Sequence, residues 1–248
     1  CPLTDGTNRL LSGGGYGDDV IRLHDLNAAH CGAWVPPTRE YRGHIGAVCG
    51  IVELTSGRFA SAGSDRTIRV WATESVACLA TLRGHTGYLY ALAAADDDTL
   101  VSGGSDKTLR VWDTRSYAAV ATITTPSEVL ALLRLTDGTL ASGHGDGVVR
   151  LWDWRRRKAV GELRGHTACV SGLVQLPDGR LASVSNDKTV RLWDVAARAC
   201  VGVVTAPVGS WRCCVTADGG LAVGCEDGHV LVRDFPWGRR SAAMTPLA

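Results

Sequence analysis

The sequence predicts an all-β fold in which four-stranded antiparallel sheets repeat around a ring. The first observation is a Trp that recurs about every 40 residues, at Trp71, Trp112, Trp152 and Trp193. The second is that Asp follows directly in three of the four cases. The third is a block of similar neighbours, such as residues 100–112, that returns with each Trp. Self-similarity at a period of about 40–45 residues that ends in Trp-Asp is typical of a β-propeller, in which each repeat supplies one four-stranded blade.

The first repeat, residues 1–26, is degenerate. Residues 10–13 and 20–25 match the pattern, with His24 where the Trp belongs. Residues 1–6 align with residues 174–179, which form the end of a strand and its turn, so we expect the chain to begin inside the innermost strand of a blade. On this expectation the sequence is a piece or processed product of a longer protein. Six repeats are visible, and two alternatives remain: a six-bladed ring, or a truncated seven-bladed ring.

Four regular repeats follow, at residues 27–72, 73–113, 114–153 and 154–194. A Gly-His pair stands at a fixed distance before the Trp in three of them, with the imidazoles at His44, His85 and His166, whereas the fourth has Thr125. A Ser stands ten positions before each Trp, at Ser61, Ser102, Ser142 and Ser183. An Asp stands six positions before each Trp, at Asp65, Asp106, Asp146 and Asp187. Spacing that repeats four times is a specific signal, whereas a lone Trp-Asp would carry almost no information.

Within one repeat, alternating apolar residues and turn residues indicate the strands. Residues 88–93 form the expected inner strand, followed by strands at 99–103, 108–113 and 118–122. Asp-Gly pairs in other repeats supply the positive φ angle that a tight hairpin requires.

The last repeat, residues 195–234, is again degenerate. Arg233 replaces the Trp and Val223 replaces the Ser. We expect residues 235–248 to form a closing outer strand or a tail, and residues 1–248 to form a single domain.

These residues resemble the WD-repeat family, and the resemblance covers nearly all of the chain. It implies that the Asp, His, Ser and Trp of one blade form a structural chain of hydrogen bonds from Asp to His, His to Ser, and Ser to the indole N–H. The three complete sets are His44, Ser61, Asp65 and Trp71; His85, Ser102, Asp106 and Trp112; and His166, Ser183, Asp187 and Trp193. The same sets superficially suggest a hydrolase triad, but three copies in three blades do not make one active site. We therefore interpret them as structural, and we expect the set in repeat 114–153 to be weaker because Thr125 replaces the His.

Composition excludes several function classes. The chain of 248 residues is 45% hydrophobic and 21% charged, with a formal net charge of +1, which argues against a nucleic-acid reader with a wide basic field. No apolar run approaches the roughly 18–20 residues that a membrane span requires. The nine Cys residues show no CxxC metal spacing; we expect buried free thiols, and hence a cytoplasmic or nuclear protein. We find no phosphate-binding loop, dinucleotide motif or metal-ligand cluster, so we expect neither an enzyme nor a cofactor.

The resemblance also implies that peptides bind across the narrow end of the central channel. The predicted binding residues come from the start of each inner strand and from just before the Asp of each set: Tyr88, Tyr90, Trp211, Glu128, Glu226, Asn186 and His144. No Arg or Lys stands at these positions, which argues against the phosphopeptide receptors of the family. Aromatic and acidic side chains favour a peptide with an apolar anchor and a basic residue.

Two groups of basic residues receive a structural interpretation. Arg22, Arg69, Arg110, Arg150 and Arg191 each stand two positions before the Trp position, where we expect salt bridges between blades or side-chain stems packed on the surface. The basic runs 155–158 and 239–240 are interpreted as solvated loops.

The predicted function is a non-catalytic scaffold that binds other proteins or peptides within a multiprotein complex. The first alternative is the substrate-recognition or adaptor portion of a ubiquitin ligase or signalling protein. The second, a subunit of an RNA- or chromatin-associated complex, depends on the basic loops alone.

Overall fold

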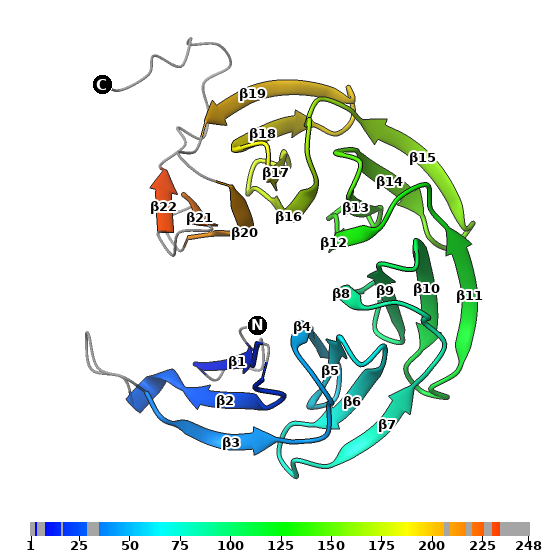
Figure 1. Ribbon diagram of the computed structural model, residues 1–248, viewed down its shortest axis with the longest axis vertical. Helices are drawn as coiled ribbons and strands as arrows, with labels where there is room; N and C mark the ends of the chain where they lie inside the picture. Colours follow the sequence, from blue (N-terminus) through cyan, green and yellow to red (C-terminus); the bar gives the residue numbers. More distant parts are fainter. Residues whose placement is uncertain are drawn as a thin grey trace.

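The structure is a computed structural model that describes residues 3, 8–15, 17–28, 35–205, 209–216, 220–225 and 230–233. Within these residues the strands form six antiparallel sheets that stand around a central axis as an open ring (Figure 1). The predicted all-β propeller of four-stranded antiparallel blades is thereby confirmed. We number the sheets blades 1 to 6 in chain order. The described part contains no helix that is long and apolar enough to cross a membrane.

The strands have the following bounds. Blade 1 contains β1 (Arg9–Gly13), β2 (Ile21–Asp25) and β3 (Pro37–Tyr41), with the short 3-10 helix η1 (Leu26–Ala28) after β2. Blade 2 contains β4 (Val48–Leu54), β5 (Arg58–Gly63), β6 (Ile68–Ala72) and β7 (Cys78–Leu82). Blade 3 contains β8 (Leu89–Ala94), β9 (Thr99–Gly104), β10 (Thr108–Asp113) and β11 (Ala119–Thr124). Blade 4 contains β12 (Val129–Arg134), β13 (Leu140–His144), β14 (Val149–Asp153) and β15 (Lys158–Leu163). Blade 5 contains β16 (Val170–Gln175), β17 (Leu181–Ser185), β18 (Thr189–Asp194) and β19 (Ala199–Thr205). Blade 6 contains β20 (Ser210–Val215), β21 (Leu221–Cys225) and β22 (Val230–Arg233).

Each blade is a simple meander, because the strands pair in the order in which they follow along the chain. The first strands of blades 2 to 6 (β4, β8, β12, β16 and β20) line the centre of the ring, and each contacts the next (Figure 1). The outer strands β7, β11, β15 and β19 begin after residues 72, 113, 153 and 194, where the expected repeats end. Each of these blades therefore includes one strand from the next sequence repeat.

Two β-bulges recur from blade to blade. One interrupts the inner strand and leaves a single residue without a partner, at Cys49, Tyr90, Leu130, Ser171 and Trp211. The other lies opposite the Trp and leaves one apolar residue of the outer strand unpaired, at Leu79, Val120, Val160 and Val201. A bulge redirects the unpaired side chain, and these four outer residues are all exposed.

The core consists of apolar layers between successive blades. Between blades 2 and 3, for example, Ile68 and Val70 pack with Leu100 and Trp112. Equivalent layers lie at the other junctions of neighbouring blades. Blades 2 to 5 therefore bury apolar residues on both faces against their neighbours, as the repeat pattern predicts.

Candidate functional site

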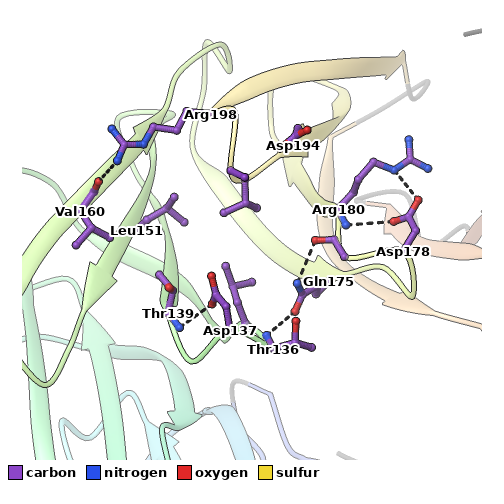
Figure 2. A pocket seen from close by; sticks show the side chains of 14 residues that line it. Thr136, Asp137, Thr139, Leu151, Val160, Gln175, Asp178, Arg180, Asp194 and Arg198 are labelled. Carbon is purple, nitrogen blue, oxygen red and sulfur yellow. Dashed lines mark hydrogen bonds and ion pairs between the residues drawn. The ribbon is translucent and has the colours of Figure 1, made fainter. Parts of the chain in front are cut away.

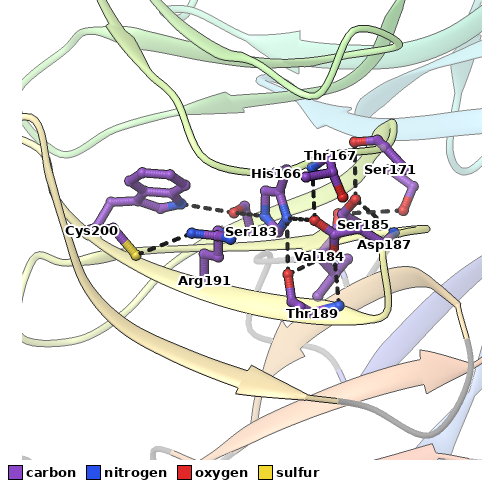
Figure 3. Close-up of polar contacts among 12 residues, drawn as sticks. His166, Thr167, Ser171, Ser183, Val184, Ser185, Asp187, Thr189, Arg191 and Cys200 are labelled. Atoms are coloured by element: carbon purple, nitrogen blue, oxygen red, sulfur yellow. Dashed lines mark hydrogen bonds and ion pairs between the residues drawn. The ribbon is translucent and has the colours of Figure 1, made fainter.

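A chain of hydrogen bonds in blade 3 runs from its core Trp to the loop before its inner strand. The indole Nε1–H of Trp112 donates to Ser102 Oγ at 2.8 Å, and Ser102 Oγ lies 2.7 Å from His85 Nε2. His85 Nδ1 lies 2.8 Å from Asp106 Oδ2. Because a carboxylate only accepts, we assign the imidazole proton to Nδ1, and Nε2 accepts the hydroxyl proton. The same chain is present in blade 2 (His44, Ser61, Asp65 and Trp71) and in blade 5 (His166, Ser183, Asp187 and Trp193; Figure 3).

The Asp at the end of this chain joins two loops. Asp106 Oδ2 also accepts from the backbone N–H of Thr86 at 3.0 Å, in the loop before the inner strand. Its Oδ1 accepts from the Thr108 hydroxyl at 2.8 Å, beyond the turn between the second and third strands. Sequence reasoning missed this Thr, although a Thr stands two positions after the Asp in all three blades, at Thr67, Thr108 and Thr189.

Burial and hydrogen bonding set the protonation of these groups. Burial lowers the pKa of His85, although the neighbouring Asp106 carboxylate acts in the opposite direction. For Asp106, burial acts to raise the pKa, but the hydrogen bonds from Thr86, Thr108 and His85 together lower it. In blade 5 the corresponding balance lowers the pKa of Asp187 to about 2. At neutral pH each pair is therefore a neutral imidazole beside an ionised carboxylate.

The Ser, His and Asp sets have no access for a substrate. The residues Ser61, Ser102 and Ser183 are 0% exposed, and each hydroxyl already lies between an indole N–H and an imidazole. Because a nucleophile must reach its substrate, these hydroxyls support the blades rather than carry out catalysis.

Blade 4 takes its imidazole from a different place in the sequence. The Trp152 indole N–H donates to Ser142 Oγ at 2.7 Å, and Ser142 Oγ lies 2.7 Å from His144 Nε2. His144 Nδ1 donates to the Ser127 carbonyl at 3.2 Å. Thr125, which replaces the usual His, donates its hydroxyl to the same carbonyl at 2.7 Å.

The prediction that His144 belongs to a binding surface is therefore wrong. The residue is 0% exposed, and burial, with the charge of Arg150, lowers its pKa to about 4. The set in repeat 114–153, which we expected to be weaker because Thr125 replaces the His, therefore also contains an imidazole. The physical reason is strand periodicity: residues two apart point to the same face of a strand, so Ser142 and His144 lie side by side.

The Asp of blade 4 binds an Arg instead of an imidazole. Arg150 Nη2 donates to Asp146 Oδ2 at 2.6 Å and its Nη1 to Oδ1 at 3.0 Å. Blade 1 shows the same arrangement, with Arg22 Nη1 at 2.6 Å from Asp18 Oδ2. In both blades a Val (Val148 and Val20) stands where the other blades have the Thr donor. Arg22 and Arg150 thus pair with an Asp of their own blade, whereas salt bridges between blades were one of the two roles expected for these Arg residues.

In blade 2 the equivalent Arg covers the loop before the inner strand. Arg69 Nη1 donates to Cys78 Sγ at 3.6 Å. A Cβ atom on Gly43 would lie 2.8 Å from Arg69 Nη1 and 3.2 Å from the Trp71 ring. The Gly of the Gly-His pair thus leaves room for the guanidinium and the indole.

The predicted binding positions gather in pairs at one end of the strands. The backbone N–H of Ser105 donates to the Tyr88 carbonyl at 2.9 Å, and that of Asn186 to the Cys169 carbonyl at 3.1 Å. An equivalent bond of 3.1 Å joins residue 145 to Glu128. We call this end the top face; it consists of the loops before the inner strands (42–47, 83–88, 125–128 and 164–169) and the turns between the second and third strands (64–66, 105–107, 145–147 and 186–188).

The side chains of the top face differ in exposure. Tyr88 is 48% exposed, and Glu128 and Asn186 are exposed as well. Sequence reasoning missed Ile45, which is 81% exposed. Ile45 directly follows His44, whereas the predicted binding positions at the starts of the inner strands lie three and five residues after each His position. Exposed basic residues also stand in three of the turns, at Arg66, Lys107 and Lys188.

Two of the predicted binding residues cannot be placed. Trp211 lies in β20 at the bulge position, but its side chain lies outside the described residues, as does the whole of Glu226.

Tyr90 lies deeper, in the centre of the ring. Together with Cys49 and Ser171 it lines a cavity of about 200 Å³ between the inner strands. Arg212 lines the same cavity and donates a hydrogen bond to the Ser171 carbonyl. Sequence reasoning missed this Arg. The available signal was its size and charge, because the equivalent positions of blades 2 to 5 hold only small residues, Gly50, Ala91, Ala131 and Gly172.

A larger cleft of about 490 Å³ lies at the opposite end of the strands, between blades 4 and 5 (Figure 2). Its polar groups are already engaged with one another. Arg180 Nε lies 2.7 Å from Asp178 Oδ2, the Asp137 carboxylate accepts from the Thr139 N–H at 2.8 Å, and Arg198 donates to the Val160 carbonyl. Nothing in this arrangement selects a particular ligand.

The basic turn at residues 155–158 also makes internal contacts. The Arg155 guanidinium lies 4.3 Å from the centre of the Trp154 ring and 3.6 Å from Asp96 of blade 3. Arg156 lies 3.6 Å from Asp153. Two of the four charges are thus engaged within the protein. Residues 239–240 lie outside the described residues.

Comparison with known proteins agrees with this geometry. Residues 35–72, 76–113, 120–153 and 157–194 match the family model described as "WD domain, G-beta repeat", and together they exceed half of the chain. Among solved structures, the WD40 β-propeller domain of Doa1 is similar with a TM-score of 0.81 and 24% identity, over 94% of this chain and 76% of that one. This likeness shows the fold alone.

Among curated proteins, the chain is similar to ribosome biogenesis protein YTM1. The protein of Saccharomyces cerevisiae is 32% identical over 71 residues, and that of Eremothecium gossypii is 36% identical over 73 residues. The matched segment is 29% of this chain and 14% of either relative. Taken with the repeated blades and their hydrogen-bonded Asp, His, Ser and Trp sets, the family match shows that the chain belongs to the WD-repeat family.

Proposed function

We propose that this chain is a non-catalytic scaffold that binds a peptide or a loop of a partner protein across its top face. A WD40 propeller fits such a role. The observation that carries the proposal is a pair of exposed apolar side chains, Ile45 and Tyr88, on equivalent loops of the neighbouring blades 2 and 3. Large exposed side chains of this kind serve as anchors in protein interfaces.

The loops beneath these two side chains are held by the hydrogen-bond chains of their blades. The backbone N–H of Ile45 donates to Asp65 Oδ2 at 3.0 Å, and the Tyr88 carbonyl accepts from the Ser105 N–H. Because the loops are held in place before a partner arrives, binding loses little conformational entropy in the protein.

The charges around the anchors define the partner further. Glu128 is acidic and exposed, whereas Arg66 and Lys107 place basic groups on the turns of blades 2 and 3. We therefore expect a peptide in which an apolar residue is flanked by charged residues. Binding should weaken only modestly with salt, since the apolar contact supplies most of the affinity.

The proposal is tested by selecting binders from a displayed library of random peptides. The variant Ile45→Ala/Tyr88→Ala should bind the selected peptides at least about tenfold more weakly, since each lost anchor costs on the order of 1–2 kcal/mol. The matched control is Leu79→Ala/Val120→Ala, which removes two exposed apolar side chains, 43% and 50% exposed, from the outer strands. Equal binding by both variants would contradict the proposal.

A second candidate is supported by the similarity to a ribosome biogenesis protein. On that reading, the chain is a subunit of a ribosome-assembly complex, and its basic turn at 155–158 lies near RNA. The affinity for RNA would then fall steeply with salt, because each phosphate contact releases counterions. A flat salt dependence would contradict this candidate.

A further inference from the structure

In blades 1 and 4, two Arg side chains share one carboxylate on the outer strand. Glu162 lies directly opposite Arg150 in the sheet of blade 4, and its carboxylate lies 3.3 Å from Arg150 Nε. A second Arg, Arg164, stands two residues after Glu162 and binds the same carboxylate at 2.5 Å. The corresponding residues of blade 1 are Arg22, Glu40 and Arg42. The repeat therefore contains a place where two guanidinium groups hold one oxyanion.

Blade 2 retains both Arg residues but lacks the acid. Arg69 lies opposite Thr81 in the sheet, and Arg83 stands two residues after Thr81. Arg69 Nε is buried without a hydrogen-bond partner, and the Asp of this blade is already engaged by His44 and Thr67. Arg83 is exposed and makes no hydrogen bond or ion pair with any residue that the structure describes. Within the described part of the chain, no carboxylate pairs with either guanidinium.

Blades 3 and 5 do not form such a cluster. In blade 3, Thr122 lies opposite Arg110, but the residue two positions later is Thr124 instead of an Arg. In blade 5, Val203 lies opposite Arg191, and an Arg is again missing two positions later. Blade 2 alone among blades 1 to 5 therefore combines two guanidinium groups with a hydroxyl in place of the carboxylate.

A thiol takes part of the place that the carboxylate fills in blade 4. Cys78 Sγ accepts from Arg69 Nη1 at 3.6 Å and lies 3.9 Å from Thr81 Oγ1. Figure 3 shows the same contact in blade 5, between Arg191 and Cys200. Sulfur is a weak acceptor, and Cys78 is exposed, so its side chain can turn away when a stronger acceptor arrives. Because Thr is shorter than Glu, that acceptor has to come from outside blade 2.

We propose that Arg69, Thr81 and Arg83 form an oxyanion-binding site for a carboxylate or phosphate group of a partner protein. The bound group takes the position of the Glu carboxylate of blades 1 and 4 and accepts from both guanidinium groups and from the Thr81 hydroxyl. Hydrogen bonds from guanidinium to carboxylate or phosphate are charge-assisted and strong. The inference is independent of the proposed function, since it uses neither Ile45 nor Tyr88.

The test follows the Nε–H signals of Arg69 and Arg150 by NMR while inorganic phosphate or acetate replaces chloride at constant ionic strength. The Arg69 signal should shift saturably, whereas the Arg150 signal should not, because Glu162 already occupies its site. Thr81→Glu gives blade 2 the carboxylate of blades 1 and 4, so this variant should bind the added anion at least about tenfold more weakly. A response to acetate would identify an acidic residue as the source of the oxyanion, and a response to phosphate alone a phosphorylated residue.

A second pair of variants separates the site from general effects of charge. Arg83→Ala should weaken anion binding at Arg69, whereas the matched control Arg164→Ala removes an exposed Arg from the same place in blade 4 and should leave the response of Arg69 unchanged. Three results would overturn the inference. The first is an Arg69 signal that shifts with neither anion. The second is an equal response of Arg69 and Arg150, and the third is a response of Arg69 that Thr81→Glu does not reduce.

Discussion

Blades 3 and 4 form the same buried hydrogen-bond chain with a His from different places in the repeat. Both hold a buried indole N–H against a buried Ser hydroxyl, and both bring an imidazole to the other side of that hydroxyl. In blade 3 the imidazole belongs to His85, before the inner strand; in blade 4 it belongs to His144, at the end of the second strand. The comparison shows that the constraint is the pairing of buried polar groups, not the position of the His, because an unpaired buried group is costly.

The second half of the comparison concerns the Asp. In blade 3, Asp106 accepts from an imidazole, a Thr and two backbone groups. In blade 4 the imidazole has moved and Val148 has replaced the Thr, so Asp146 is available to bind Arg150. The relocated His is thus accompanied by two further changes, Val148 in place of the Thr and Arg150 as the partner of Asp146.

The largest expected effect comes from removing the relocated imidazole. His144→Ala should lower the free energy of unfolding by about 2–4 kcal/mol, because it strands Ser142 and leaves a cavity. The measurement is urea unfolding followed by tryptophan fluorescence. If His144 were instead a surface residue, the free energy of unfolding would not change.

The pH dependence of stability should follow from the same residue. The folded pKa of His144 is about 4, below the ordinary value of 6.5, so between these values the unfolded chain binds more protons than the folded one. This contribution is therefore fully present above pH 6.5 and is lost as the pH falls toward 4, by on the order of 3 kcal/mol in total.

The control for this prediction is the same titration with His144→Ala. The free energy of unfolding of His144→Ala should rise less steeply between pH 4 and 6.5 than that of the unchanged protein. The two slopes should differ by at most about 1.4 kcal/mol per pH unit. Identical slopes for the two proteins would show that His144 titrates normally.

A smaller effect separates the two Asp residues. Asp106→Ala should destabilise by about 1–3 kcal/mol, because it strands a buried imidazole and the N–H of Thr86. Asp146→Ala should cost less, about 1 kcal/mol or below, because its carboxylate is 34% exposed and Arg150 retains Glu162 at 3.3 Å. Equal losses in thermal unfolding would remove the distinction between the two blades.

The sequence carried enough information for the ring, but only for part of the network. The spacing of Ser102, Asp106 and Trp112 specified the fold and one set of contacts, because every member recurred at a fixed interval. The buried role of His144 was missed because the other blades have no His at the equivalent position. Its spacing of two from Ser142, which places both side chains on one face of a strand, was the available signal.

The exposed side chains of the top face were predictable to a similar degree. Counting along the repeats brought Tyr88 to the top face, but exposure depends on how a loop projects, and Ile45 was missed for that reason. Arg212 was missed because charge was sought at the rim rather than at the small-residue positions inside the ring. Trp211 stays a prediction.

The smallest effect concerns the Thr that the repeat contains and blade 4 lacks. Thr108→Val should destabilise by about 0.5–1.5 kcal/mol, because it removes the hydroxyl that Asp106 accepts at 2.8 Å. Val148→Thr in blade 4 should give no comparable gain, since the Asp146 carboxylate is already paired with Arg150. A gain equal to the loss in blade 3 would show that Asp146 is free to accept.

The most direct test of the relocated imidazole is an NMR titration of the His144 ring nitrogens. The structure predicts a neutral ring with its proton on Nδ1 that remains neutral down to pH about 4. Titration near the ordinary value of 6.5, or a proton on Nε2 at neutral pH, would contradict the assignment of His144 to the core of blade 4.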